Sequence, residues 1–336
     1  MNKFFAIILK LGLIAFIIGL IVALVGLATV GFDFKALSNA KTETISSTFE
    51  NEAAINKITI DARTSNVYVI FSDTAEKLSA TYTVKCYKNS EKQITSIIET
   101  VNESHLTLVE ERSFFGIINL WSLEETKIEI TVPKSRAIAL DVNITTGDTT
   151  VTGMATPAPI KVDATTGDIT IDTVAANKIE LESSTGDIRI TNATCSSIEA
   201  EIGTGDIAIS SVVCEGEIDV ETSTGALLLR DVTAGAIMRE GTTGDTEIRG
   251  AVKTKSFICD VNSGDIECED GKLDAEKILI EARTGDVELN LVRDQSEYEI
   301  SVNVTTGDSN IRNQNGGPGE IKVNATTSDV EIYFGK

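Results

Sequence analysis

Acidic residues at regular intervals are the part of this sequence that could do chemistry. An aspartate follows a Thr-Gly pair, or a close variant of it, again and again, as in VDATTGDITI at 162–171, with 19 to 22 residues between repeats. The aspartates concerned are Asp148, Asp168, Asp187, Asp206, Asp245, Asp265, Asp286, Asp308 and Asp329. Carboxylates stacked in a column repel one another unless they bond backbone groups or share cations, and calcium takes six to eight oxygen ligands.

Three interpretations of this aspartate column stay open. The carboxylates could hold a repeated turn by an Asx-type bond to their own nearby backbone, bind calcium, or contact carbohydrate. Calcium-binding β-rolls carry a glycine-rich loop at both turns of a coil, whereas this repeat has one. The stretch STGALLL puts Ala226 where the aspartate belongs. Because one repeat dispenses with the carboxylate, the turn-holding interpretation is favoured, and no metal site is assigned.

Catalytic constellations are scarce in this chain. Its single histidine is His105, and the sequence contains no nucleophile elbow, phosphate-binding loop or zinc-ligand spacing. Polysaccharide-cleaving β-helices use a few clustered acids, whereas these aspartates are evenly spread. The sequence therefore predicts no enzyme, no catalytic residue and no cofactor, with a glycan-acting β-helix enzyme as a remote alternative.

The elements that position the aspartates follow from the apolar pattern around them. With each aspartate position numbered zero, positions −8 and +3 are apolar in nearly every repeat, and alternate positions from −8 to −4 are apolar or small. This period of two predicts two short strands per repeat. Position −2 is always threonine or serine, and its phase predicts a side chain packed inside the corner.

A repeated turn separates the two strands. Glycine, which enters positive φ without penalty, stands at position −1 in nine repeats. These turn glycines are Gly147, Gly167, Gly186, Gly205, Gly225, Gly244, Gly264, Gly285 and Gly307. The fold class predicted is all-β: a parallel β-solenoid of about ten such coils plus one divergent coil at 58–69.

Residues outside the regular coils predict the ends of the stack. Strand-like runs between 72 and 137 predict a β-rich cap over the first coil. Within it, FFGIINLW holds Phe114, Phe115 and Trp121, which either pack the cap or form an exposed docking patch. The last coil ends at VEIYFGK without a capping helix, which predicts open strand edges at that end.

The first residues predict a membrane anchor. Residues 11–32 carry no charge and are long enough to span a bilayer as one helix. Lysines before it favour an N-terminus inside and a solenoid outside the cell membrane. The domains expected are an anchor at 1–35, a linker at 36–55, the divergent coil and cap at 56–137, and the solenoid at 138–336. Whether the anchor is cleaved stays open.

Charge and cysteines add further expectations. The net charge of −22 excludes nucleic-acid binding. Cys195 and Cys214 fall at equivalent positions of adjacent coils, and Cys259 and Cys268 on facing strands, so each pair could form a disulfide or stay as buried thiols. Arg239 falls at an inward position, so either a one-residue bulge turns Met238 inward instead, which is favoured, or the arginine is buried and paired.

The residues quoted so far resemble a known family. The anchor helix, the entry coil INKITIDARTSNVYV, the strand IEITVP and the successive TGDI coils are similar to the bacterial putative-adhesin family of envelope proteins. The resemblance covers about residues 50–336. It implies the solenoid fold and an adhesin-like or envelope-stress-associated role, and it supplies no catalytic residues.

These observations predict a membrane-anchored, extracytoplasmic β-solenoid that acts as a structural or interaction module. Its partner would be an envelope protein or a wall polymer, with a homo-oligomer as a further option. Two alternatives are a scaffold that polymerises end to end and a calcium-stabilised adhesin.

Overall fold

The computed structural model describes residues 3–29, 40–49, 52–88, 92–112, 125–268 and 271–335. The chain divides into two compact units. The first comprises Met1–Thr44, Thr83–Ser96 and Glu111–Glu125, and the second comprises Ile45–Tyr82, Ile97–Glu110 and Thr126–Lys336. The second unit is a parallel β-solenoid, so the predicted fold class is confirmed, with about nine turns.

The first unit holds the N-terminal helix α1 (Lys3–Thr29) and the start of β1 (Ala40–Thr48). Within this unit the Cys86 thiol donates a hydrogen bond to the Glu43 carboxylate at 3.4 Å. Side chains from Leu13 to Val25 of α1 are exposed and apolar. Among the residues whose side chains are described, no helix is long and apolar enough to cross a membrane. The anchor therefore stays a prediction.

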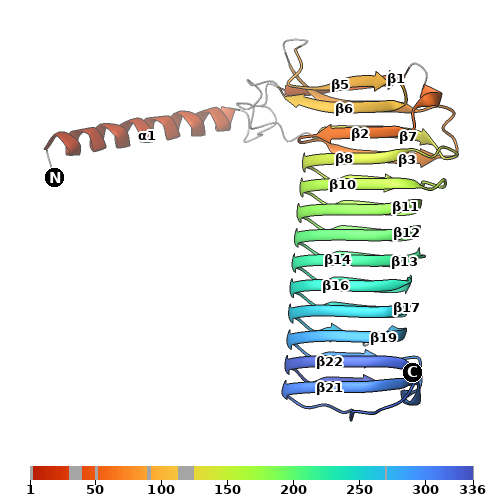
Figure 1. Ribbon diagram of the computed structural model, residues 1–336. Helices are drawn as coiled ribbons and strands as arrows, with labels where there is room; N and C mark the ends of the chain where they lie inside the picture. Colours follow the sequence, from red (N-terminus) through yellow and green to blue (C-terminus); the bar gives the residue numbers. More distant parts are fainter. Residues whose placement is uncertain are drawn as a thin grey trace. The chain divides into compact units, whose positions relative to one another are not determined.

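One side of the solenoid is a sheet of parallel, in-register strands, one above the other (Figure 1). Its strands, some of which continue around a corner, are β8 (Ala139–Thr146), β10 (Ala158–Thr166), β11 (Ile169–Thr185), β12 (Ile188–Thr204), β14 (Glu217–Thr224), β16 (Ala236–Thr243), β17 (Thr246–Ser263) and β19 (Gly271–Thr284). Each pair aligns equivalent repeat positions, as Ile179 with Ile198. No single coil could bury its apolar face alone, so the stack makes the core.

The opposite side is built from the second strand of each coil. It contains β9 (Thr149–Thr152), the first halves of β11, β12 and β17, β13 (Ile207–Cys214), β15 (Leu227–Thr233), β18 (Ile266–Glu267) and β20 (Val287–Asn290). Side chains at −8 and +3 meet between the two sides. Ile179, Ile218 and Ile209, for example, are 0% exposed. Buried and exposed side chains alternate along these strands with the period of two that the sequence predicted.

The threonines at −2 contradict the sequence prediction. They do not fill the corner, because the chain bends two residues before the glycine and turns positions −3 and −2 both to solvent. The exposed residues at −2 are Thr146, Thr166, Thr185, Thr204, Thr224, Thr243, Ser263, Thr284, Thr306 and Thr327. They stack in register and form an outer column of hydroxyls.

The divergent coil forms the N-terminal part of the stack. Its strands β2 (Lys57–Ala62) and β3 (Asn66–Ser72) pair with β8 and β9 on one side. On the other side they pair with β6 (His105–Arg112) and β7 (Lys127–Pro133). The segment between them includes β4 (Ser79–Tyr87) and β5 (Thr95–Asn102), so the region from 72 to 137 is rich in strands as predicted.

The C-terminal coil is not the last coil in space. Its strand β22 (Gly319–Thr327) lies between β19 and β21 (Tyr298–Thr306), and β23 (Val330–Tyr333) pairs with β20 (Figure 1). The coil that precedes it in sequence therefore ends the stack. The order reflects side-chain type: that coil has Ser309 at +1, where the C-terminal coil has the fully buried Val330.

The expected open edge at this end is partly covered. Residues 313 and 314 lie along the outer edge of β21. Ile300 exchanges two backbone hydrogen bonds with Gln314, at 2.8 and 2.9 Å, and the N–H of Val302 donates to Asn313 Oδ1 at 2.7 Å. These contacts occupy edge groups that another strand would need.

Candidate functional site: the outer columns of the solenoid

The aspartates at position zero form a one-way ladder. In all but one of these coils the backbone N–H at position zero donates to the Oδ1 of the residue at zero in the adjacent coil, at 2.8–3.0 Å. The first acceptor is Asn66, on which Asp148 rests at 3.0 Å. The next acceptors are Asp148, Asp168, Asp187, Asp206, Asp245, Asp265, Asp286 and Asp329.

This ladder corrects the expected Asx-type turn, because each carboxylate bonds the neighbouring coil and not its own backbone. A charge-assisted bond to a backbone N–H offsets part of the repulsion within the column. The ladder uses one carboxylate oxygen of every aspartate except Asp308, which only donates its N–H. Among the described residues, no three acidic, histidine or cysteine side chains lie close enough to hold a metal ion. The column thus acts as a set of links between coils.

The ladder breaks at Ala226, and a different link replaces it. Ala226 supplies no carboxylate to the N–H of Asp245, and these residues belong to adjacent coils. Between the same two coils, Arg239 Nη2 donates to the carbonyl of Gly225 at 3.1 Å and Nη1 donates to Thr222 Oγ1. The outer carboxylate link is therefore replaced by an inner guanidinium link at this one interface.

Arg239 itself contradicts the predicted bulge. It pairs in unbroken register with Val220 and Cys259, and its side chain is 0% exposed. The space it needs comes from Gly241, where a Cβ would lie 2.8 Å from the guanidinium. Burial lowers the pKa of Arg239, whose hydrogen bonds go to carbonyls and a hydroxyl instead of a carboxylate.

A second acidic column lies at position −5, which sequence analysis missed. Seven successive coils carry an acid there, each the register partner of the next. They are Asp163, Glu182, Glu201, Glu221, Glu240, Asp260 and Glu281. An alignment of the repeats would have shown them, because position −5 faces outward between two buried positions. Neighbouring carboxylates about 4.8 Å apart repel by on the order of 1 kcal/mol in water.

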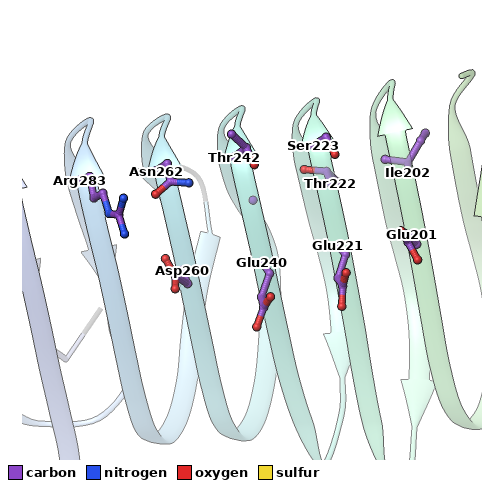
Figure 2. A pocket seen from close by; sticks show the side chains of 11 residues that line it. Glu201, Ile202, Glu221, Thr222, Ser223, Glu240, Thr242, Asp260, Asn262 and Arg283 are labelled. Atoms are coloured by element: carbon purple, nitrogen blue, oxygen red, sulfur yellow. The ribbon is translucent and has the colours of Figure 1, made fainter. Parts of the chain in front are cut away.

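A shallow groove of about 300 Å³ runs beside the middle of this column (Figure 2). Its acidic rim is Glu201, Glu221, Glu240 and Asp260, and Ser223, Thr242, Asn262 and Arg283 at position −3 line the other side. Burial, followed by the neighbouring carboxylates, raises the pKa of Glu221. The groove thus offers a column of acids beside a column of two hydroxyls, one amide and one guanidinium, at the spacing of the coils.

The same two columns continue toward the N-terminal coils. There a groove of about 660 Å³ is lined by Asp61, Asp163 and Glu182 at −5 and by Arg63, Thr145, Thr165 and Ser184 at −3. Beside this groove, lysine side chains neutralise part of the negative charge. Lys178 bridges Glu180 and Glu199 at 2.9 and 2.7 Å, and Glu180 also pairs with Lys161. Hydrogen bonds to both lysines lower the pKa of Glu180.

Glu110 is a buried residue that sequence analysis also missed. Its carboxylate is 0% exposed and accepts backbone N–H groups of Arg63, Thr64 and Ser65 at 2.7–3.1 Å. These amides form the turn of the divergent coil. A buried carboxylate is costly unless its oxygens are hydrogen-bonded, as they are here. Glu110 therefore closes the N-terminal corner of the stack.

All five cysteines are buried free thiols. Cys195 and Cys214 are register partners, and a thiol hydrogen bond between them together with burial raises the pKa of Cys195. Cys259 instead contacts the hydroxyl of Thr246 at 3.7 Å, and the Cys268 thiol faces the carbonyl of Asn290. The structure thus contains neither of the disulfides considered from sequence. The aromatic patch at Phe114, Phe115 and Trp121 lies outside the described residues.

Several solved structures are similar to this chain. A crystal structure described as a putative adhesin from Parabacteroides distasonis is 13% identical, covers 88% of this chain and 97% of its own, and has a TM-score of 0.44. A putative adhesin from Bacteroides fragilis is 17% identical, with the same coverage and a TM-score of 0.35. A structure described as a putative lipid binding protein from Parabacteroides distasonis is 13% identical, covers 76% of this chain and 98% of its own, and has a TM-score of 0.45.

No curated protein matches the chain. The model of one family matches residues 55–334, which include the divergent coil, the cap segment and all the regular coils. By this match the chain belongs to the Toastrack DUF4097 family, a family of domains of unknown function.

Proposed function

We propose that this protein is a non-enzymatic, membrane-anchored β-solenoid that presents its outer columns to a partner outside the cell membrane. The observation that carries the proposal is the continuous side on which acids at −5 and hydroxyls at −3 and −2 stack in register. A rigid, periodic polar surface suits a partner that is itself extended, such as a wall polymer or a cationic segment of an envelope protein.

The central part of the acidic column is the strongest part of this surface. No ion pair engages Glu201, Glu221, Glu240 or Asp260 within the residues that the structure describes, so their charge is free for a partner. The regular coils lack a clustered set of acid, base and nucleophile, which supports binding over catalysis.

Binding is tested by capture of native cell-wall material and membrane proteins on the anchored, full-length chain. The variant Glu221→Gln/Glu240→Gln should lose most of the captured material, and its loss should grow at low salt, where charge attraction is strongest. The matched control Glu215→Gln/Glu217→Gln removes the same charge from exposed residues at another corner and should bind as before. Equal capture by both variants contradicts the proposal.

Localisation is tested separately. The uncharged residues 11–32 would place the solenoid outside the membrane with a short basic segment inside. Protease added to intact cells should then digest the solenoid while an internal protein survives. A solenoid that survives until the cells are lysed would overturn this orientation.

End-to-end polymerisation by strand pairing receives little support from the structure, because residues 313 and 314 occupy the outer edge of β21. A calcium-stabilised form is tested by melting the protein with millimolar calcium and with chelator. The ladder needs no cation, so the two curves should coincide.

A further inference from the structure

The C-terminal coil fills a slot that other parts of the chain create. Within the described strands, β22 is the only strand paired with β21, and it also pairs with β19. Without β22, the outermost coil would stand one empty layer, about 4.8 Å deep, away from the rest of the stack. The slot thus has two parallel strand edges, one on each side.

The contacts inside this slot are those of an interior coil. Asp329 donates its N–H to Asp286 Oδ1 and accepts the N–H of Asp308, both at 2.8 Å. Ile321, Val323 and Val330 are 0% exposed. The slot therefore recognises a coil by its strand pattern and its carboxylate at zero.

The second strand of the inserted coil is held on both sides as well. β23 pairs with β20, and Asn310 of the outermost coil clasps Ile332 by accepting its N–H at 2.9 Å and donating to its carbonyl at 3.3 Å. The outermost coil, at 298–311, therefore covers the slot and is called the lid here.

A short exposed tether connects the lid to the inserted coil. Residues 315–318 are exposed, and a Cβ added to Gly316 would meet no atom within 4 Å, whereas one added to Gly317 would lie 2.5 Å from the backbone of Tyr298. Gly316 and Gly317 have φ of 93° and 108°. The tether begins after Gln314, whose backbone is hydrogen-bonded to Ile300 of the outermost coil. The inserted coil can therefore leave the slot while residues 313 and 314 stay on the outer edge of β21.

We propose that the slot also accepts the C-terminal coil of a second copy of the chain, which gives a closed dimer joined at the C-terminal ends of two solenoids. The second copy offers the same coil, so every contact in the slot is reproduced and only residues 315–318 change path. Five Cα–Cα links from Gln314 to Gly319 reach about 16–18 Å, whereas the slot lies about one strand spacing below the end of the facing stack.

This exchange goes beyond the proposed function, since it needs neither the acidic columns nor an outside partner. In the proposed dimer the same two chains exchange coils with each other, so the contact is isologous and closes at two copies instead of forming a filament.

The test uses two differently tagged full-length chains expressed together. Asn303 and Asn324 are register partners whose side chains hydrogen-bond at 3.1 Å between lid and inserted coil. One chain carries Asn303→Cys and the other Asn324→Cys. A disulfide between the two tags forms only where the coil of one chain occupies the slot of the other. We expect several-fold more cross-linked dimer than with Asn143→Cys in place of Asn303→Cys.

A single chain with both Asn303→Cys and Asn324→Cys supplies the geometric control, because an intrachain disulfide there shows that the positions can cross-link in a folded protein. A tether lengthened by four Gly-Ser residues should lower the interchain product, since a longer hinge favours the coil's own slot. Interchain product no higher than with Asn143→Cys, alongside an efficient intrachain bond, overturns the proposal.

Discussion

The two corners of each coil bend the chain by different means. At the first corner the turn glycines have φ between 125° and 147°. At the second, five residues after position zero, Thr173, Asn192, Ser211 and Asp231 take φ of 53–56°. The first corner excludes side chains because coils touch there: a Cβ on Gly186 would lie 2.1 Å from the carbonyl oxygen of Gly167. In these four coils the second corner holds a side chain but strains it.

The largest expected effect comes from making the first corner like the second. Gly186→Ala adds a Cβ both at φ 136° and in contact with the coil before it. We expect the free energy of unfolding to fall by at least about 3 kcal/mol. Chemical denaturation of the full chain measures this. Thr173→Ala, which changes a side chain at the second corner, should stay within about 0.5 kcal/mol.

The ladder at the first corner can be completed. Ala226→Asp would give the N–H of Asp245 the carboxylate that equivalent residues have, and should raise the free energy of unfolding by about 1 kcal/mol. Ala226→Asn tests the share of charge, because an amide oxygen can accept the same bond without a charge. A lower denaturation midpoint for Ala226→Asp would show that Arg239 already meets the need of this interface.

The second corner can be relieved of strain. A β-branched residue in the left-handed region costs about 1–2 kcal/mol, and glycine gives back about 0.5–1 kcal/mol in unfolded-state entropy. Thr173→Gly should therefore stabilise the protein by roughly 0.5 kcal/mol, visible as a small rise in melting temperature. Gly250 occupies the same position in another coil, with a φ of 63°, and shows that glycine is accepted at this corner. A fall in melting temperature would mean that the threonine hydroxyl matters more than the strain.

The smallest effect concerns the acids that lead into the first corner. The pKa values of Glu221 and Asp219 are raised in the folded state, by burial first and by nearby carboxylates second. The folded state then binds protons more tightly than the unfolded state, so stability should be highest below the ordinary carboxyl pKa and decline as the pH rises through the raised values. Melting temperatures between pH 4.5 and pH 7.5 test this trend.

Glu221→Gln should flatten the pH dependence and leave a slightly higher melting temperature at pH 7.5. The ion pairs of Glu180 act in the opposite direction, because the pKa of that group is lowered and its contribution is lost on acidification. A melting temperature that rises with pH in the parent chain would show that these pairs dominate.

The solenoid could be read from the sequence because its core positions repeat in every coil, and −8 and +3 are buried as their residue types predict. The outward direction of Thr146 and its equivalents could not be predicted, because a shift of the bend by one residue decides which way a side chain points. The burial of Arg239 was not favoured from sequence for a related reason. A charged residue at an inward position suggests a bulge in the strand, unless one notices that Gly241 has no side chain and so leaves space for the guanidinium.

Links between coils were the hardest part to foresee. An aspartate beside a glycine suggests a local turn, and only the stacked geometry shows that its carboxylate reaches the next coil. The spatial order of the last two coils could have been predicted by comparing the repeats position by position. Ser309 is polar at +1, where most other coils place an apolar, buried strand residue, which is typical of a coil with nothing beyond it.

The placement of both end structures has a consequence for how such proteins can grow. The N-terminal corner is closed by Glu110 and the C-terminal end by the coil at 298–311, and neither touches the coils from Ile169 to Ser263. Coils added or removed within that stretch would leave both closures intact. The length of such a solenoid can therefore change in steps of about 4.8 Å, one coil at a time. Duplication of the DNA that encodes one coil would lengthen the protein without changes at either end.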